Sequence, residues 1–370
     1  MIFTRLAPFL RSRTARDLTR EALLRMDPET AHQATITALR LGLVSEKEQV
    51  QHSELKTEIC GMELQNPVGM AAGFDKNAHV PAALGQIGFG FVEVGTLTPR
   101  PQPGNPKPRV FRLEKSQGVI NRMGFNNDGH QAAYKRLKGQ HFQSIVGVNV
   151  GANKDSADFV SDYVAGIKCF ADVADYLTVN ISSPNTPGLR NLQSDEALKR
   201  LLGEALAERA RARVRVPVFL KLAPDLDQLQ LDVIAKVILA TDLDGLIISN
   251  TTISREMIDD VEHVGEAGGL SGKPLFNLAT TRLAQMRQRV GNDMPIIGVG
   301  GIHSAQSAIA KFSAGANAIQ VYSALVFQGM ELLEEVRNGL VKATRAAGHE
   351  NVAALTGSNV DDWANGKVAI

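Results

Sequence analysis

The feature that most constrains the fold is a series of eight short apolar runs that begins near residue 66. The runs are nearly continuous apolar strings rich in β-branched residues, as is typical of parallel strands buried on both faces. We expect strands at Val68–Ala71, Phe91–Val94, Ile145–Val150, Tyr176–Ile181, Val218–Leu222, Gly245–Ile248, Ile296–Val299 and Ala318–Val321.

Segments with helical spacing separate several of these runs, the clearest being Glu196–Arg211, Leu229–Ala240, Leu278–Gln288 and Ser304–Ala314. This alternation predicts an α/β fold, a (β/α)8 TIM barrel over residues 46–349. An open, doubly wound sheet is the alternative that the pattern leaves open. A chain of 370 residues with 44% apolar residues suits one large barrel with an appendage.

Residues 1–45 have a different pattern, with six arginines before residue 26 against Asp17 and Glu21. Asp27 followed by Pro28 is typical of a helix start, and apolar residues recur at helical spacing up to Gly42. We expect two short amphipathic helices. They form either a structural cap on the barrel or a pair that lies on a membrane surface, with the arginines toward lipid headgroups.

The rest of the composition mainly excludes classes of protein. A formal net charge of +1 gives no general attraction to nucleic acid. The two cysteines, Cys60 and Cys169, have no motif spacing, which argues against a disulfide framework or a cysteine metal site. No run approaches 18 uninterrupted apolar residues, and no secretory signal is recognisable. Residues 350–370 have little periodicity, and we expect a surface tail there.

In a barrel of this kind the active site lies at the carboxyl ends of the strands. Polar and small residues gather at these ends, namely Ala72, Gly73, Lys76, Thr96, Asn149, Asn180, Lys221, Ser249, Asn250, Gly301, Tyr322 and Ser323. Gly300-Gly301 and a helix opening at Tyr322-Ser323 suggest a phosphate site, although Gly-Gly is also an ordinary tight turn. The asparagines suit a small heterocycle, and the lysines suit an anion; alone, each could be a turn residue or a surface ion pair.

Longer motifs resemble one known family, the dihydroorotate dehydrogenases. The motifs are Ala71–Lys76, Asn121–Asn127, Asn180–Arg190, Leu270–Pro274 and Ile297–Ile302, in the family's order, and the likeness spans about residues 27–345. One class of the family is soluble and uses a cysteine as catalytic base. At the matching position here stands Ser183, as in the quinone-using, membrane-associated class. Asp27–His32 also resembles the N-terminal extension of that class, where two helices form a quinone tunnel. The stretch before Asp27 and residues 350–370 extend beyond the family pattern.

The resemblance implies flavin mononucleotide (FMN) as cofactor and assigns residues by position. The implied FMN contacts are Ala72, Gly73, Lys76, Thr96, Asn149, Asn180, Lys221, Ser249, Gly272, Gly301, Tyr322 and Ser323. The implied substrate contacts are Lys76, Asn121, Arg122, Met123, Gly124, Phe125, Asn180, Asn185, Asn250 and Thr251. Ser249 stands where the family has threonine, which keeps a hydroxyl.

The implied reaction is the oxidation of dihydroorotate to orotate in pyrimidine biosynthesis. Ser183 takes a proton from C5, with Thr186 or a water chain as relay, and a hydride leaves C6 for the flavin. Lys221 stabilises charge on the reduced flavin, and a membrane quinone reoxidises it. We expect a monomer bound peripherally to the cytoplasmic side of the inner membrane, without metal or nucleic acid. The rivals are another FMN barrel oxidoreductase, a barrel lyase or isomerase with a phosphorylated substrate, and a non-catalytic scaffold.

Overall fold

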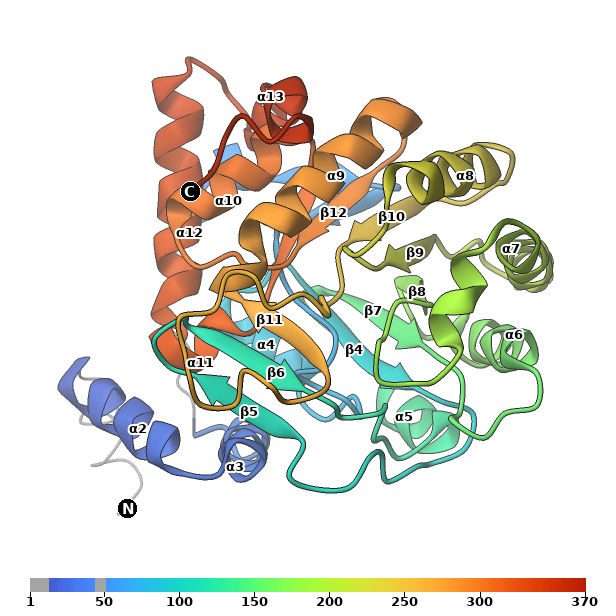
Figure 1. Cartoon of the computed structure of the whole chain (residues 1–370), viewed down its shortest axis with the longest axis horizontal. Coiled ribbons are helices and arrows are strands. Elements are labelled where there is room, and N and C mark those ends of the chain that lie inside the picture. The colour runs from blue at the N-terminus through green and yellow to red at the C-terminus, as the bar shows by residue number, and fades with distance from the viewer. Residues whose placement is uncertain (1–12, 44–50) are drawn as a thin grey trace.

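A closed barrel of eight parallel strands forms the centre of the molecule (Figure 1). The computed structural model describes residues 13–43 and 51–370. The barrel strands are β3 (Val68–Met70), β4 (Phe91–Leu97), β7 (Ile145–Val150), β8 (Tyr176–Asn180), β9 (Val218–Leu222), β10 (Gly245–Ile248), β12 (Ile296–Val299) and β13 (Ala318–Val321). Each strand pairs with the next, and β13 pairs with β3. The predicted barrel is therefore confirmed, and the closure excludes the open sheet.

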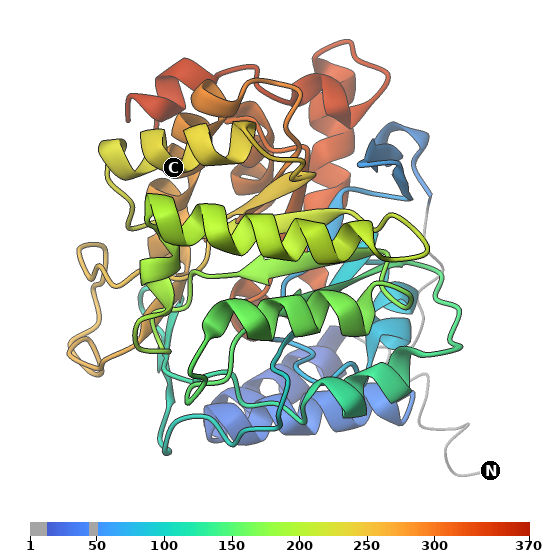
Figure 2. The same cartoon turned by 90° about the vertical axis from the view of Figure 1, so that its right-hand side faces the viewer.

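One outer helix follows each barrel strand, and together these helices form a ring around the barrel (Figures 1 and 2). They are α4 (Pro81–Ile87), α5 (His130–Leu137), α6 (Phe159–Phe170), α7 (Asp195–Ala210), α8 (Gln228–Leu239), α9 (Phe276–Val290), α10 (Ala305–Ser313) and α12 (Glu331–Ala346). The helix expected after Tyr322-Ser323 is only the short α11 (Ala324–Gln328). Single turns of 3-10 helix lie at Ser53–Leu55, Leu189–Gln193, Lys273–Leu275 and Val352–Leu355.

A hairpin closes the amino-terminal end of the barrel. Its strands β1 (Thr57–Ile59) and β2 (Met62–Leu64) place Ile59 and Leu64 in a buried cluster with Phe91, Tyr176 and Phe219 from inside the barrel. Burying aromatic rings of this size excludes water from this end. The open space of the barrel therefore lies at its other end, where the strands finish.

A three-stranded antiparallel sheet at the carboxyl end was not predicted. It consists of β5 (Val110–Leu113), β6 (Gly118–Asn121) and β11 (Gly269–Gly272), inserted between barrel strands and their helices. Asn121 in β6 is opposite Gly269 in β11 and Val110 in β5. The sheet adds a wall above the strand ends.

Two N-terminal helices form a separate layer at one end of the molecule, as predicted (Figures 1 and 2). They are α2 (Arg13–Arg25) and α3 (Pro28–Arg40). The side chain of Asp27 caps α3 by accepting a hydrogen bond from the Thr30 N–H at 2.9 Å. Arg112 of β5 donates to the carbonyl oxygens of Leu24 and Met26, which ties the end of α2 to the barrel. Residues 1–12 and 44–50, which include the first part of the predicted N-terminal extension, lie outside the described residues.

The C-terminal segment is folded, contrary to the expected surface tail. It contains the helix α13 (Val360–Ala364), and the Trp363 side chain is only 2% exposed. Trp363 packs edge-to-face on Phe276 of α9 and donates a hydrogen bond to Ser313 of α10. The sequence lacked a periodic pattern here because the segment docks through one large aromatic residue rather than through a helical stripe.

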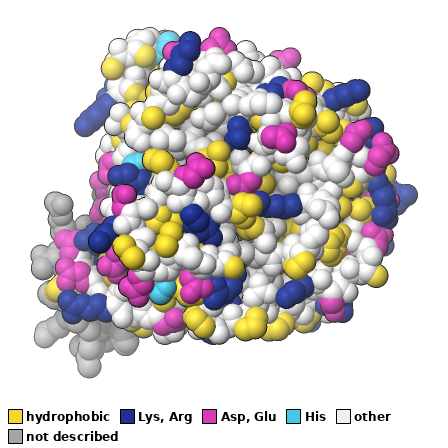
Figure 3. Space-filling view, in the orientation of Figure 1, with side chains coloured by type: hydrophobic (Ala, Val, Ile, Leu, Met, Phe, Trp, Pro, Cys, Tyr) yellow, Lys and Arg dark blue, Asp and Glu magenta, His cyan; other side chains and the backbone are white. Residues whose placement is uncertain are grey.

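The face seen in Figure 3 carries positive and negative side chains intermixed, without a dominant sign. No helix among the described residues has the length and hydropathy needed to cross a bilayer.

Candidate active site

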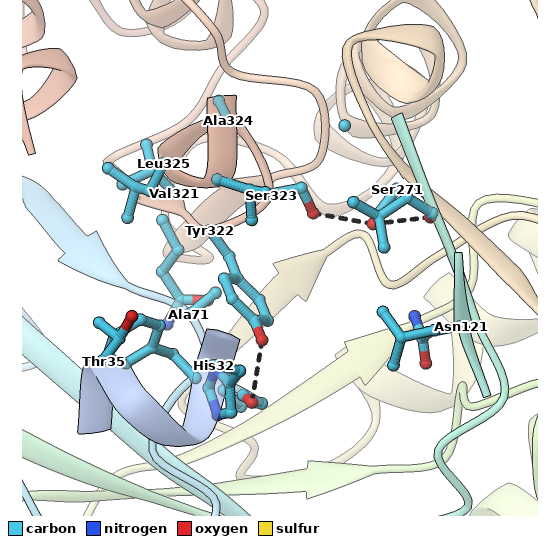
Figure 4. A pocket seen from close by; sticks show the side chains of 18 of the residues that line it. His32, Thr35, Ala71, Asn121, Ser271, Val321, Tyr322, Ser323, Ala324 and Leu325 are labelled. Atoms are coloured by element: carbon cyan, nitrogen blue, oxygen red, sulfur yellow. Dashed lines mark hydrogen bonds between the residues drawn. The ribbon is translucent and has the colours of Figure 1, made fainter. Parts of the chain in front are cut away.

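One large cavity opens at the carboxyl end of the barrel. Its volume is about 1610 Å³, and its wall combines strand ends, the three-stranded sheet and the two N-terminal helices. In Figure 4, His32 and Thr35 of α3 face one side of this space, and Ser271 and Asn121 lie on another side. The cavity therefore reaches from the centre of the barrel to the helical pair.

The end of β3 and the end of β13 meet at one carbonyl oxygen. The Lys76 ammonium donates to Gly73 O at 2.7 Å, and the Tyr322 hydroxyl donates to the same oxygen at 3.3 Å. Burial, with the charges of Glu29 and Arg109 opposing each other, lowers the pKa of Lys76 to about 8. Lys76 is thus a cation held at the cavity wall where an anionic ligand would offset the cost of its burial.

The polar ends of β4, β7 and β8 are joined by hydrogen bonds. Asn180 donates to the Thr96 hydroxyl at 3.0 Å and to Asn149 Oδ1 at 3.1 Å. Asn250, just after β10, donates to Asn180 Oδ1 at 3.2 Å and to the Ser182 hydroxyl at 2.9 Å. Amides fixed in this way present defined donors and acceptors to a ligand.

Ser183 lies directly after this network and is 6% exposed at the cavity wall. Its Oγ accepts a hydrogen bond from the Asn185 N–H at 3.2 Å, and the Asn185 amide donates to Asn121 Oδ1 at 3.2 Å. Thr186 is 3% exposed, and its hydroxyl has no hydrogen-bond partner among the described residues. A buried hydroxyl without a hydrogen-bond partner is uncommon. The Thr186 hydroxyl can therefore still donate a hydrogen bond to a nearby group or accept one from it.

Glycine backbones shape the wall at the ends of β12 and β11. Gly300 and Gly301 have φ values of +99° and +78°, and a Cβ on Gly301 would lie 2.3 Å from the Phe276 Cα. Nearby, the Ser323 hydroxyl donates to the Ser271 hydroxyl at 2.8 Å (Figure 4). Only glycine permits this close approach to the start of α9, and both glycines also line the cavity.

The helical pair adds an apolar wall to the same cavity. Leu23, Leu24, Ala31, Ala38 and Leu39 line this part. His32 packs edge-to-face on Phe74 at 5.4 Å between ring centroids, and Phe74 packs on Tyr322 at 5.8 Å. Burial, together with the charge of Lys76, lowers the pKa of His32 to about 3, so its imidazole is neutral.

Most residues proposed from the sequence line this cavity. From the FMN set these are Ala72, Gly73, Lys76, Thr96, Asn180, Lys221, Ser249, Gly272, Gly301, Tyr322 and Ser323. From the substrate set they are Lys76, Asn121, Met123, Gly124, Phe125, Asn180, Asn185, Asn250 and Thr251, together with the candidate base Ser183.

Two of the proposed residues lie behind the wall instead. Asn149 is fully buried and contacts the cavity only through Thr96 and Asn180. The Arg122 guanidinium lies over the Phe111 ring and pairs with Glu266 at 2.6 Å.

Sequence reasoning missed His32 and Gln320, which also line the cavity. The described residues contain no group of three or more His, Cys, Asp or Glu side chains placed to hold a metal ion.

The closed barrel and the polar cavity at its carboxyl ends define a (β/α)8-barrel enzyme. The family model described as dihydroorotate dehydrogenase matches residues 54–343. A dihydroorotate dehydrogenase (quinone) of Rhizobium rhizogenes is 53% identical over 357 residues, covering 95% of this chain and 99% of that protein. One of Agrobacterium fabrum is 52% identical, covering 94% and 97%.

A crystal structure of DHODH from Eimeria tenella, in complex with ferulenol, superimposes with a TM-score of 0.87. Its sequence is 37% identical, and the match covers 92% of this chain and 98% of that one. The chain belongs to the dihydroorotate dehydrogenase family, in its quinone-dependent class.

Proposed function

We propose that the chain oxidises dihydroorotate to orotate in pyrimidine biosynthesis, with FMN as cofactor and a membrane quinone as final electron acceptor. The observation that carries this proposal is the continuity of one cavity of about 1610 Å³ from Ser183 to the helical pair. The polar end of this cavity, near Ser183, suits a pyrimidine acid, and its apolar end, next to the helical pair, suits a quinone. The part of the cavity between these ends suits a flavin.

The residues present fit FMN. The backbone at Gly272, Gly301 and Tyr322, together with the Ser323 hydroxyl, suits its phosphate, because glycine N–H groups can approach a ligand without side chains in between. Gln320 lines the cavity, and its amide oxygen is buried without a hydrogen-bond partner among the described residues, so it can accept from a ring N–H. Ala72, Gly73, Lys76, Thr96, Asn180, Lys221 and Ser249 would surround the flavin ring. FMN, when bound, supplies the hydride acceptor.

Dihydroorotate would lie between the flavin position and the loop that follows β6. Its carboxylate would bind Lys76 and the backbone of residues 123–125, and its ring amides would bind Asn121, Asn185, Asn250 and Thr251. These contacts orient the substrate so that C5 faces Ser183.

Ser183 would remove the C5 proton. A serine hydroxyl is a weak base, so it must pass its own proton onward as it receives one. The unpartnered hydroxyl of Thr186 is the proposed relay, since it is buried and three residues from Ser183. The Asn185 N–H already donates to Ser183 Oγ, which fixes where the hydroxyl points.

The space between α2, α3 and the barrel would admit the quinone. Its apolar lining suits an isoprenoid chain, and neutral His32 with Tyr322 suits a quinone ring at the inner end. Leu18, Met26, Leu41 and Leu43 of the helical pair are exposed apolar side chains, at 57%, 38%, 67% and 46%. They support the proposal that the chain associates peripherally with a membrane. We further propose that it does so as a monomer, on the cytoplasmic side of the inner membrane.

The test is an anaerobic titration of protein purified in mild detergent. We expect a yellow protein that dihydroorotate bleaches and that a quinone then restores. A yellow protein that dihydroorotate does not bleach contradicts the substrate, whereas one that is bleached but not restored contradicts the acceptor. A colourless protein that takes up no FMN contradicts the whole proposal.

A further inference from the structure

A carboxylate lies inside the barrel, beneath the cavity. Glu93 is fully buried in the middle of β4, where its side chain is on the same face of the strand as that of Phe91 two residues earlier. Phe91 belongs to the aromatic cluster that closes the amino-terminal end. Glu93 therefore occupies the layer between that cluster and the cavity.

Three neutral side chains direct hydrogen-bond donors at Glu93. Asn149 donates to Oε1 at 2.7 Å, Gln320 donates to Oε2 at 2.8 Å, and the Tyr176 hydroxyl donates to Oε2 at 3.1 Å. Burial and the Glu93 charge raise the pKa of Tyr176 well above its ordinary value, so the phenol keeps its proton. Three donors aimed at one side chain suit a carboxylate, whose oxygens accept hydrogen bonds.

Among the described side chains, Lys221 is the one cation that lies next to this carboxylate. Its ammonium lies 3.6 Å from Glu93 Oε1, and both side chains are at least nine-tenths buried. A distance of 3.6 Å is too long for a good hydrogen bond, so the interaction is mainly one of charge. Lys221 also lines the cavity, and within the described part of the chain its ammonium has no hydrogen-bond acceptor. Its donors are therefore available to a ligand in the cavity.

We propose that Glu93 is a positioning residue that holds the Lys221 ammonium toward the cavity and offsets its charge. This inference rests on the proposed function, in which Lys221 contacts the flavin. An uncompensated lysine would favour the electron-rich, reduced flavin and raise its midpoint potential. By offsetting that charge, Glu93 keeps the potential low enough for electrons to leave to quinone, while the lysine still contacts the ring.

The experiment is a measurement of the midpoint potential of the bound flavin against a reference dye. In Glu93→Gln, which keeps the shape and removes the charge, we expect the two-electron equilibrium to shift toward reduced flavin at least tenfold, or about 30 mV. Glu93→Asp retains the charge and should stay within threefold of the unmodified protein. Tyr176→Phe removes a neutral donor to the same carboxylate, so it should also stay within threefold.

A pair of variants tests the charge balance directly. Lys221→Met alone should shift the equilibrium at least tenfold toward oxidised flavin. Lys221→Met combined with Glu93→Gln removes both charges and should return within threefold of the unmodified protein. The double variant also avoids leaving one charge buried without its partner, so it can fold where a single variant does not.

A Glu93→Gln protein with an unchanged potential would overturn the inference. So would a double variant that stays as far shifted as Lys221→Met. Either result is distinct from failure of the proposed function, which would appear in the unmodified protein as flavin that dihydroorotate cannot bleach.

Discussion

Glu29 in α3 and Arg109 just before β5 form a buried, two-pronged ion pair. Arg109 Nε donates to Glu29 Oε2 at 3.0 Å, and a terminal nitrogen donates to Oε1 at 2.6 Å. Arg109 also donates to the carbonyl oxygen of Asn105, whose side chain donates to Asn185 O at 3.4 Å. The helical pair is thus tied through two residues to the part of the cavity proposed for the substrate.

The reaction has two halves, the reduction of the flavin by dihydroorotate and its reoxidation by quinone. We expect that breaking this ion pair slows the second half-reaction and leaves the first nearly unchanged. Glu29→Gln leaves the Arg109 charge buried without its partner, which typically costs about 3–5 kcal/mol. That cost falls on the docking of α3, which lines the proposed quinone space. We expect quinone reduction to slow at least fivefold in a stopped-flow assay, with bleaching by dihydroorotate within twofold of normal.

The matched control is Glu63→Gln, because Glu63 is exposed in β2 on the hairpin that closes the opposite end of the barrel. Its substitution should leave both half-reactions unchanged. Equal slowing of both half-reactions in Glu29→Gln would mean that the ion pair supports the barrel as a whole rather than the helical pair.

The glycine at the end of β12 gives a test of the proposed phosphate site. In Gly301→Ala, the new Cβ would lie 2.3 Å from Phe276 Cα, so the backbone must shift away from its position. We expect the fraction of protein that retains FMN after gel filtration to fall at least fivefold. Gly291→Ala is the control, since Gly291 has a similar φ of +74° but nothing within 4 Å of an added Cβ. A similar loss of FMN in both variants would mean that backbone strain at a positive φ causes the loss, rather than a displaced phosphate site.

The sequence predicted the barrel well because each strand carries its own apolar run. Five of the eight strands have the predicted bounds, for example Ile145–Val150 and Val218–Leu222. The cap of α3 was equally local, since Asp27 and Pro28 act within one turn. Signals that reside in adjacent residues can be read without knowing the rest of the fold.

Features that depend on distant partners could not be predicted in the same way. Strands β6 and β11 are about 150 residues apart in the sequence and pair through backbone groups that have no pattern of their own. Arg122 belongs to a motif that matches the substrate loop, yet its guanidinium pairs with Glu266 in a loop after β10. Glu93 is the one charged residue in β4, and only the closed barrel brings it near Lys221, which lies in β9.

The buried imidazole of His32 predicts a specific dependence of stability on pH. Its pKa is about 3 in the folded chain, because of burial and the charge of Lys76, against 6.5 as the ordinary value. Below pH 6.5 the unfolded chain binds a proton that the folded chain does not, so stability is lost progressively as the pH falls from 6.5 toward 3. Between pH 6 and 5, the free energy of unfolding should fall less steeply in His32→Gln than in the unmodified chain. The difference between the two slopes should be about 1 kcal/mol per pH unit.

Urea unfolding at a series of pH values, followed by circular dichroism, measures this difference. His141→Gln is the control, since His141 is exposed and its removal should leave the slope unchanged. If the chain with His32→Gln lost stability on acidification as steeply as the unmodified chain, the imidazole would not be held neutral in the folded state.

The proposed base can be tested apart from the quinone reaction. Ser183→Ala removes the group that would accept the C5 proton, and a positioned base typically contributes about 10²–10⁴-fold. We expect bleaching of the flavin by dihydroorotate to slow by at least 10²-fold in anaerobic stopped-flow measurements. Reoxidation of chemically reduced flavin by quinone should stay within twofold, because that step needs no proton from C5.

Two further variants distinguish a base from a residue that merely shapes the wall. Ser183→Cys supplies another group able to bind the proton in nearly the same volume, so it should recover part of the rate with a changed pH profile. Thr186→Val keeps the shape and removes the unpartnered hydroxyl, so a relay role predicts about tenfold slower bleaching. Near-normal bleaching in Ser183→Ala would assign the proton to another group, and a rate in Thr186→Val equal to that of the unmodified protein would leave a water chain as the relay.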